Sequence, residues 1–154
     1  MTPYTGGCTC GAIRYEITAE PVRSFQCQCR DCQRDTGGGH SSVMVFPRAA
    51  IQITGEAVES PRTADSGAAK EKAFCGRCGS PLYNKPQNVP DMIGVYVGTL
   101  DDPSGFQPQI VMFASRGHSW DHLDPALPKV PHMRGSSRRS AAPVSPSPRS
   151  APRL

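Results

Sequence analysis

Short stretches of the chain alternate between hydrophobic and polar residues, and clusters of turn-forming residues separate them. In Ala12–Ile17, the apolar residues Ile13, Tyr15 and Ile17 alternate with charged ones. A period of two is typical of a strand with one buried face. Further strands are expected at Ser24–Gln28, Val43–Phe46, Ile51–Thr54, Ala73–Cys75, Met92–Val97 and Ile110–Ala114.

Helical patterns are nearly absent from the sequence. No stretch has the spacing of an amphipathic helix of three turns, and only single turns are expected at Gln33–Asp35 and Pro47–Ala50. The polar stretch Asp65–Lys72 is expected to be a loop, and Trp120 a core anchor. Sixteen prolines and fifteen glycines favour short strands and turns. The sequence therefore predicts one all-β domain over residues 1–128.

The last part of the chain, residues 129–154, differs in composition from the rest. It is rich in Ser, Pro and Arg, and carries six basic residues and no acidic one, whereas the preceding part carries eleven basic and thirteen acidic residues. Such a segment buries too little apolar surface to offset its chain entropy, so we expect a disordered basic tail. We expect it to be solvated without a fixed partner, and nucleic-acid binding is not expected.

The start of the chain lacks a basic segment followed by an apolar one, and no stretch approaches the roughly eighteen apolar residues of a membrane span. We therefore expect a cytoplasmic protein that does not enter a membrane. Disulfides rarely persist in the reducing cytosol, so the seven cysteines point to metal binding. No pattern indicates an oligomeric state.

The cysteines form three closely spaced motifs. These are Cys8-x-Cys10, Cys27-x-Cys29-x-x-Cys32 and Cys75-x-x-Cys78-Gly79. Each spacing suits several ligands on one ion, and structural zinc takes four protein ligands whereas catalytic zinc usually takes three. Seven thiols divide into a quartet of Cys8, Cys10, Cys75 and Cys78, and a triplet of Cys27, Cys29 and Cys32. In the alternative, one site combines Cys75 and Cys78 with Cys32 and either Cys27 or Cys29, and the remaining cysteines are unused.

These motifs, with their neighbours, resemble the glutathione-dependent formaldehyde-activating enzymes, a family that also includes centromere-protein-V-like members. The resemblance rests on segments 6–16, 27–37, 74–82 and 116–120, together with Pro47 and Thr54-Gly55. It implies a small β-tent-like zinc fold with zinc-ribbon-type knuckles. It also implies structural zinc on the quartet, catalytic zinc on the triplet, and glutathione as cosubstrate. Gln28 departs from the family pattern, where His or Ser is common, and its amide cannot relay a proton.

Three thiolates on Zn²⁺ form a site of net charge −1, which is better suited to binding a fourth thiol than to polarising a peptide bond. The bound thiol becomes a thiolate, the nucleophilic form. The predicted function is a zinc-dependent carbon–sulfur lyase that condenses glutathione with formaldehyde to S-hydroxymethylglutathione. The partners are then a small thiol and an aldehyde. The alternative is a non-catalytic zinc module that recruits a partner, like the centromere-protein-V-like members.

Glutathione carries two carboxylates, so an active protein needs cations near the open zinc. Arg30 and Arg34 flank the triplet in sequence and are the candidates, with a role in balancing thiolate charge as the alternative. Gly37 and Gly38 belong to a glycine loop that could let a peptide backbone approach closely. The alternative for this loop is a plain turn.

Overall fold

Short strands dominate the structure, a computed structural model that describes residues 3–132. The strands are β1 Tyr4–Gly7, β2 Arg14–Ile17, β3 Arg23–Cys27, β4 Ser41–Pro47, β5 Ile51–Thr54, β6 Val58–Thr63, β7 Ala69–Phe74, β8 Pro81–Pro86, β9 Met92–Tyr96, β10 Val111–Met112 and β11 Lys129–Val130. The helical segments are α1 Arg30–Thr36 and the 3-10 turns η1 Arg48–Ala50, η2 Val97–Thr99 and η3 Ala114–Arg116. The prediction of an all-β fold is confirmed.

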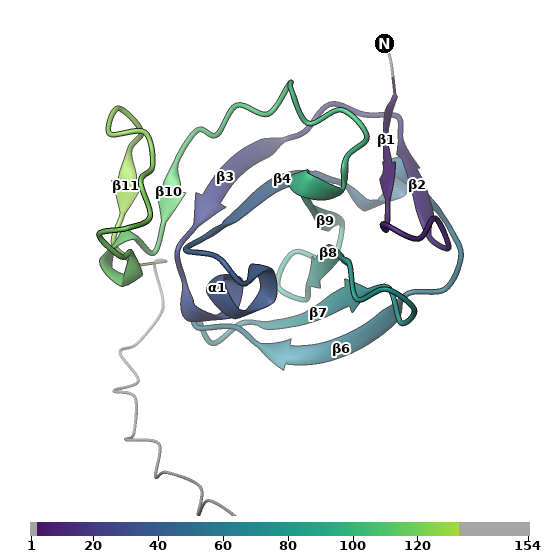
Figure 1. Cartoon of the computed structure of the whole chain (residues 1–154), viewed down its shortest axis with the longest axis horizontal. Coiled ribbons are helices and arrows are strands. Elements are labelled where there is room, and N and C mark those ends of the chain that lie inside the picture. The colour runs from purple at the N-terminus through teal and green to yellow at the C-terminus, as the bar shows by residue number, and fades with distance from the viewer. Residues whose placement is uncertain (1–2, 133–154) are drawn as a thin grey trace, which may run out of the picture.

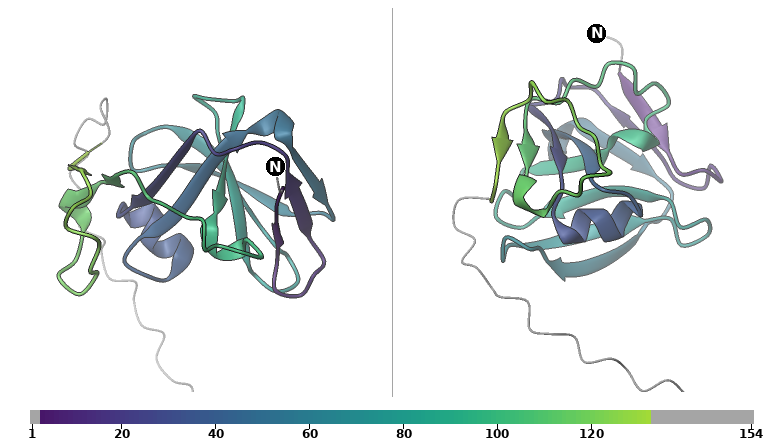
Figure 2. Two further views of the ribbon diagram at one scale, coloured as in Figure 1. Left: turned by 90° about the horizontal axis from the view of Figure 1, so that it is seen from above. Right: turned by 60° about the vertical axis from the view of Figure 1, so that its left-hand side comes forward.

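The strands form two sheets. One has the order β1-β2-β5, and the larger one has the order β11-β10-β3-β4-β9-β8-β7-β6. Neighbours pair antiparallel except that β10 pairs parallel with both β3 and β11. The β1–β2 pair and the β10–β11 pair lie at opposite ends of the molecule, and α1 lies between them on the inner side of the large sheet (Figures 1 and 2).

The hydrophobic core lies between the two sheets and follows the strand alternation. In β2, Tyr15 and Ile17 are buried while Arg14 and Glu16 are exposed, as the sequence pattern predicts. The central strands β4 and β9 contribute the most extensive apolar runs because both of their faces are covered. The principal core residues are Ile13, Tyr15, Ile17, Met44, Phe46, Leu82, Tyr83, Ile93, Val95, Val97 and Leu100.

The expected loop at Asp65–Lys72 is wrong in its second half, because its last residues belong to β7. This strand is rich in charged residues, and Lys72 is buried there only because its ammonium group donates to the Asp35 carboxylate, at 2.8 Å. Strands β6 and β8 also lack a strong apolar alternation and were not predicted. The expectation for Trp120 is wrong as well, since its side chain is 63% exposed and stacks on His118.

The single turn expected near Gln33 is a seven-residue helix, α1. Its N-cap is Cys29, whose sulfur accepts a hydrogen bond from the Cys32 N–H at 3.4 Å. Cysteine is not among the usual N-cap residues, so no conventional start signal marks this helix in the sequence. Gly37, at φ 72°, ends the helix in the left-handed conformation.

The predicted domain boundary at residue 128 falls beside β11, in which Lys129 and Val130 pair with β10. The rest of the predicted tail, residues 133–154, lies outside the described residues. Among residues 3–132, no helix has the length and apolar character needed to cross a membrane.

Candidate metal centres

Two turns from different sheets bring the cysteine quartet together. Its members are Cys8 and Cys10 in the β1–β2 turn, and Cys75 and Cys78 in the β7–β8 turn. The sulfurs of Cys8 and Cys10 are 3.6 Å apart, and those of Cys10 and Cys75 are 3.7 Å apart. Zinc–sulfur bonds of about 2.3 Å in a tetrahedron place sulfurs about 3.8 Å apart. The quartet is therefore compatible with a closed zinc site.

The two turns share one local geometry. The N–H of Gly11 donates to the Cys8 carbonyl at 3.1 Å, and that of Gly79 donates to the Cys75 carbonyl at 2.8 Å. Both glycines have a φ of 76°, a conformation that costs other residues energy. Gly79 thus takes the left-handed conformation that typically follows a zinc knuckle.

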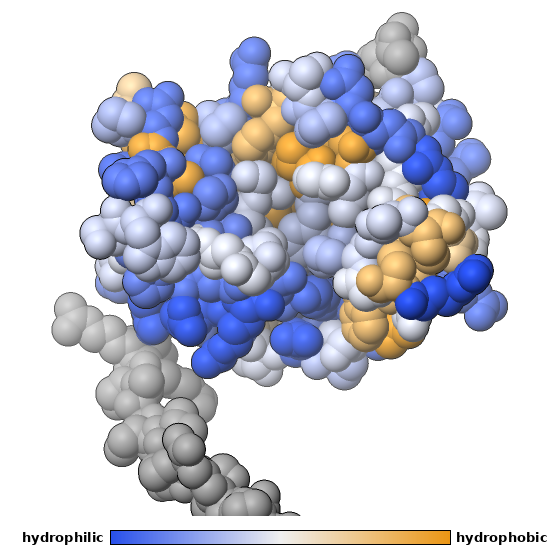
Figure 3. Space-filling model, viewed as in Figure 1, coloured by the Kyte–Doolittle hydropathy of each residue, from blue (hydrophilic) through white to orange (hydrophobic). Residues whose placement is uncertain are grey.

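Ser80 favours the thiolate form of one of the exposed cysteines. Its hydroxyl and backbone N–H lower the pKa of Cys78 to about 5. The same hydroxyl lies 3.1 Å from the backbone N of Thr9, which links the two turns. Figure 3 shows apolar residues gathered where these turns meet, at the right-hand edge of the molecule.

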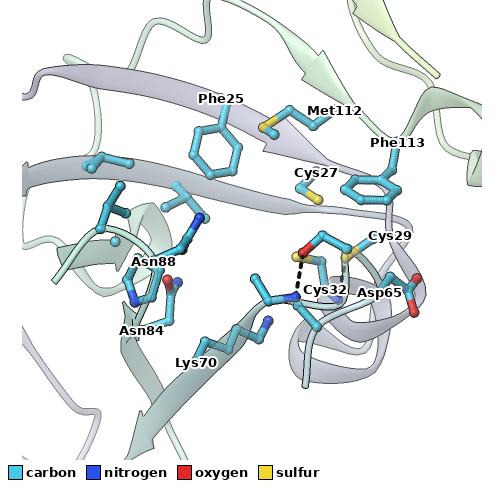
Figure 4. A pocket seen from close by; sticks show the side chains of 18 of the residues that line it. Phe25, Cys27, Cys29, Cys32, Asp65, Lys70, Asn84, Asn88, Met112 and Phe113 are labelled. Atoms are coloured by element: carbon cyan, nitrogen blue, oxygen red, sulfur yellow. Dashed lines mark hydrogen bonds between the residues drawn. The ribbon is translucent and has the colours of Figure 1, made fainter. Parts of the chain in front are cut away.

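The cysteine triplet lies elsewhere, at the junction of β3 and α1. Cys27 ends β3, Cys29 caps α1, and Cys32 lies in its first turn. All three are buried, with exposed fractions of 5%, 5% and 9%, and their sulfurs lie within 4.8 Å of one another. Phe113, with Phe25 and Met112, packs against them (Figure 4). The rival grouping, which mixes these cysteines with Cys75 and Cys78, does not occur.

Three cysteine thiols this close together are difficult to deprotonate at the same time unless a cation balances their charge. Hydrogen bonds from Cys27 and Cys29 lower the pKa of Cys32, whereas donating to Cys29 and Cys32 raises the pKa of Cys27. Deprotonation of one cysteine of the triplet therefore makes deprotonation of the next one less favourable. The hydroxyl of Ser41 is fully buried and lacks an ordinary hydrogen bond within residues 3–132, yet it lies near enough to Cys32 to lower its pKa further. This donor set, three thiols and an orphaned hydroxyl, fits a thiophilic cation such as zinc.

Gln28 has a structural role between the first two cysteines of the triplet. Its buried amide donates from Nε2 to Asp121 Oδ2 at 2.9 Å. The other oxygen of Asp121 lies 2.8 Å from His40 Nδ1, which therefore carries the proton, and His40 Nε2 lies 3.3 Å from the amide of Gln26. This network of amide, carboxylate and imidazole groups fixes the loop that carries Cys27 and Cys29 to the segment after η3. His40 belongs to neither cysteine cluster.

The glycine loop after α1 packs against the same carboxylate. A Cβ built on Gly39 would lie 2.3 Å from Asp121 Cγ, so only glycine fits there. Gly37 and Gly38 are exposed, and neither lines the cavity described below. In the structure, this loop therefore ends α1 and leaves room for the side chain of Asp121.

A cavity of about 320 Å³ opens beside the triplet, between β3–β4 and the β6–β7 connection (Figure 4). Its apolar wall consists of Phe25, Val43, Val45, Val89, Met112 and Phe113, and its polar groups include Arg23, Asp65, Lys70, Asn84 and Asn88. The size falls at the lower end of the range for small-molecule sites. All three cysteines of the triplet line it.

Neither Arg30 nor Arg34 lines this cavity. The guanidinium of Arg30 contacts the side chain of Gln33, and Arg34 is exposed in the last turn of α1. The cations that do line the cavity are Lys70 and Arg23. Sequence reasoning missed Lys70 because it was expected to lie in a loop, and no local pattern connects it with the cysteines 38 or more positions earlier.

Phe113 closes one side of the triplet in an unusual conformation. Its φ of 56° is the one positive value among the non-glycine residues in 3–132. Such a bulky residue in the left-handed region costs about 1–3 kcal/mol and often marks a functional site. The strained backbone directs the ring against the cysteines (Figure 4).

Comparison with known proteins finds relatives of modest sequence identity. Relatives from Penicillium rubens and Fusarium vanettenii are each 28% identical over 120 residues, or 73% of this chain. One from Halomonas elongata is 26% identical over 101 residues, or 62% of this chain. All three are provisionally named as glutathione-dependent formaldehyde-activating enzymes. The alignments span 62 to 64% of the length of these relatives.

The crystal structure of a Rhodobacter sphaeroides protein has a similar fold, with a TM-score of 0.51 and 20% identity. The similarity covers 68% of this chain and 91% of that one. Residues 3–116 match the family described as glutathione-dependent formaldehyde-activating enzyme, and they contain all seven cysteines. Because the match covers most of the sequence and every candidate metal ligand, this chain belongs to the family of glutathione-dependent formaldehyde-activating enzymes.

Proposed function

We propose that this chain is a zinc-dependent carbon–sulfur lyase that joins glutathione to formaldehyde as S-hydroxymethylglutathione. The observation that carries the proposal is a buried cysteine triplet that faces a cavity and has no fourth Cys, His or carboxylate ligand within residues 3–132. The quartet would hold a second, structural zinc. All seven cysteines are free thiols, which suits a cytoplasmic protein.

The reaction adds the glutathione sulfur to the carbonyl carbon of formaldehyde. A carbon–sulfur bond forms, the π electrons of the carbonyl pass to its oxygen, and that oxygen takes up the proton lost by the thiol. Zinc on the triplet would supply an open coordination position at which a thiol has a lowered pKa. Gln28 is held by Asp121, and its amide has no ionisable proton, so we assign it to positioning the ligand loop rather than to proton transfer.

The cavity wall contributes by excluding water and restricting the approach. Phe25, Met112 and Phe113 pack around the cysteines and give the space beside them an apolar lining. In such a site, electrostatic interactions are stronger than in water, and a bound thiol and aldehyde are held close together. These are the contributions that an addition reaction between two small molecules requires.

The test is glutathione binding to the zinc-loaded protein. Calorimetry in buffers with different ionisation enthalpies should show that binding releases about one proton, because a coordinating thiol is deprotonated. Cys29→Ala should abolish both the binding and the proton release while the quartet keeps its metal. Elemental analysis should find two zinc ions per wild-type chain.

If the wild-type protein holds two zinc ions but does not bind glutathione at millimolar concentration, the lyase proposal is wrong. The alternative function, a non-catalytic zinc module that recruits a partner, would then be favoured. Production of S-hydroxymethylglutathione above the uncatalysed rate, followed by NMR with ¹³C-formaldehyde, would support the lyase directly.

A further inference from the structure

We infer that Lys70 binds a carboxylate of glutathione in the cavity beside the triplet, an inference that rests on the proposed function. Lys70 lies on β7, and its side chain is only 12% exposed. Figure 4 shows its ammonium end directed into the cavity, between Asn84 and Cys32. The cavity thus has a cation on one side and three sulfurs on another.

Lys70 is not paired with a carboxylate at hydrogen-bonding distance. One buried carboxylate, that of Asp35, lies near it, with Oδ2 3.9 Å from Lys70 Nζ, which is too long for a hydrogen bond. The same carboxylate accepts from Lys72 Nζ at 2.8 Å and lies 3.6 Å from Arg62. Three cations thus share the Asp35 carboxylate. The carboxylate of Asp65, which also lines the cavity, accepts a hydrogen bond from the backbone N–H of Arg30 at 2.9 Å.

The hydrogen-bonding state of Asp35 points the same way. Besides Lys72, the hydroxyl of Tyr96 donates to Asp35 Oδ2 at 3.2 Å, so both oxygens of the carboxylate have donors. Lys70 itself has no hydrogen-bond acceptor within residues 3–132. A largely buried ammonium without an acceptor is costly, and an anion entering the cavity would remove that cost.

Glutathione matches this site in chemistry. Glutathione carries one thiol and two carboxylates. The cavity has three sulfurs on one side, where a zinc-bound thiol would fit, and a nearly buried ammonium group on another. The amides of Asn84 and Asn88 offer donors and acceptors for the peptide groups between them. Arg23 also lines the cavity but is exposed, so solvent screens its charge.

A purely structural role for Lys70 is the alternative. The ammonium could serve only to balance the charge of the thiolates, since its field also lowers the pKa of Cys32, after the effects of Cys27 and Cys29. The two roles differ in one measurable respect. A carboxylate-binding residue discriminates between ligands with and without carboxylates, whereas a charge-balancing residue affects metal retention and every thiol alike.

The test compares Lys70→Met with Lys85→Met in the full-length, zinc-loaded protein. Lys85 pairs with Glu59 and does not line the cavity, so its replacement removes the same charge elsewhere. Calorimetry would measure the affinity for glutathione and for its diethyl ester, in which neither carboxylate is charged. Lys70→Met should fold, because Lys72 and Arg62 still face Asp35.

The expected result is that Lys70→Met weakens glutathione binding about ten- to hundredfold, the loss of one charged hydrogen bond. Its affinity for the diethyl ester should stay within about twofold of wild type, and Lys85→Met should change neither. Equal weakening of both ligands, or loss of zinc from the triplet with unchanged discrimination, would overturn the assignment. If wild-type protein binds neither ligand, the proposed function fails, and the assignment of Lys70 fails with it.

Discussion

Replacing Asp35 with Asn should destabilise the protein by about 3 kcal/mol, at the lower end of the cost of breaking a buried ion pair. The Asp35 side chain is 1% exposed and that of Lys72 is 10% exposed. Asparagine keeps the shape and one acceptor oxygen, so the hydrogen bond from Tyr96 can survive. It removes the charge, however, and leaves the buried ammonium of Lys72 without a counterion.

The expected loss of about 3 kcal/mol is large relative to the total free energy of unfolding. Domains of this size are stable by about 5–15 kcal/mol, so the loss is a substantial fraction. It should lower the melting temperature by about 10 °C. Because Asp35 lies on α1 and Lys72 on β7, we also expect the triplet to hold its metal less tightly in this variant.

The assay is urea denaturation of the zinc-loaded protein, followed by circular dichroism. The control is Glu59→Gln, which breaks the more exposed pair with Lys85 and should cost about 0–1 kcal/mol. In the double variant Asp35→Asn with Lys72→Met, part of the lost stability should return, since no unpaired buried ammonium remains there. An Asp35→Asn variant as stable as Glu59→Gln would refute the reasoning.

Three further predictions concern the two cysteine clusters, the backbone at Phe113, and the Glu59–Lys85 pair. Cys78→Ser should unfold the protein, since metal on the quartet joins two sheets, whereas Cys32→Ser should stay folded with one zinc ion. Circular dichroism and elemental analysis would check this, and equal loss of fold in both variants would contradict it. Phe113→Gly should be more stable to urea than Phe113→Ala by about 1 kcal/mol, because glycine relieves the positive φ; the opposite order would exclude backbone strain. The ammonium of Lys85 lowers the pKa of Glu59, so this pair should stabilise the fold at neutral pH and lose that effect as pH falls below about 4. In urea titrations over that pH range, the Lys85→Met variant should therefore lose less stability than the wild-type protein.

The sequence by itself determined the features that depend on neighbouring residues. The alternation in β2 predicted which side chains are buried, because successive residues of a strand point to opposite faces. The cysteine spacings predicted the three ligand motifs, because residues two or three positions apart can reach the same ion. That Cys10 meets Cys75, 65 positions away, was decided by the tertiary structure. Gly79, with its positive φ, is a local turn feature of the same kind.

Features that depend on contacts between distant segments were decided only by the tertiary structure. Charged β7 is a strand because Asp35 compensates Lys72, and that partner lies 37 positions earlier. Gln28 is held by Asp121, 93 positions away, and the cations near the triplet come from β7 and β3 rather than from the flanking arginines. Sequence patterns report the period and spacing of residues along one segment. They do not report which polar groups meet when strands from opposite ends of the chain pair, because burial and charge compensation arise only after those strands are assembled.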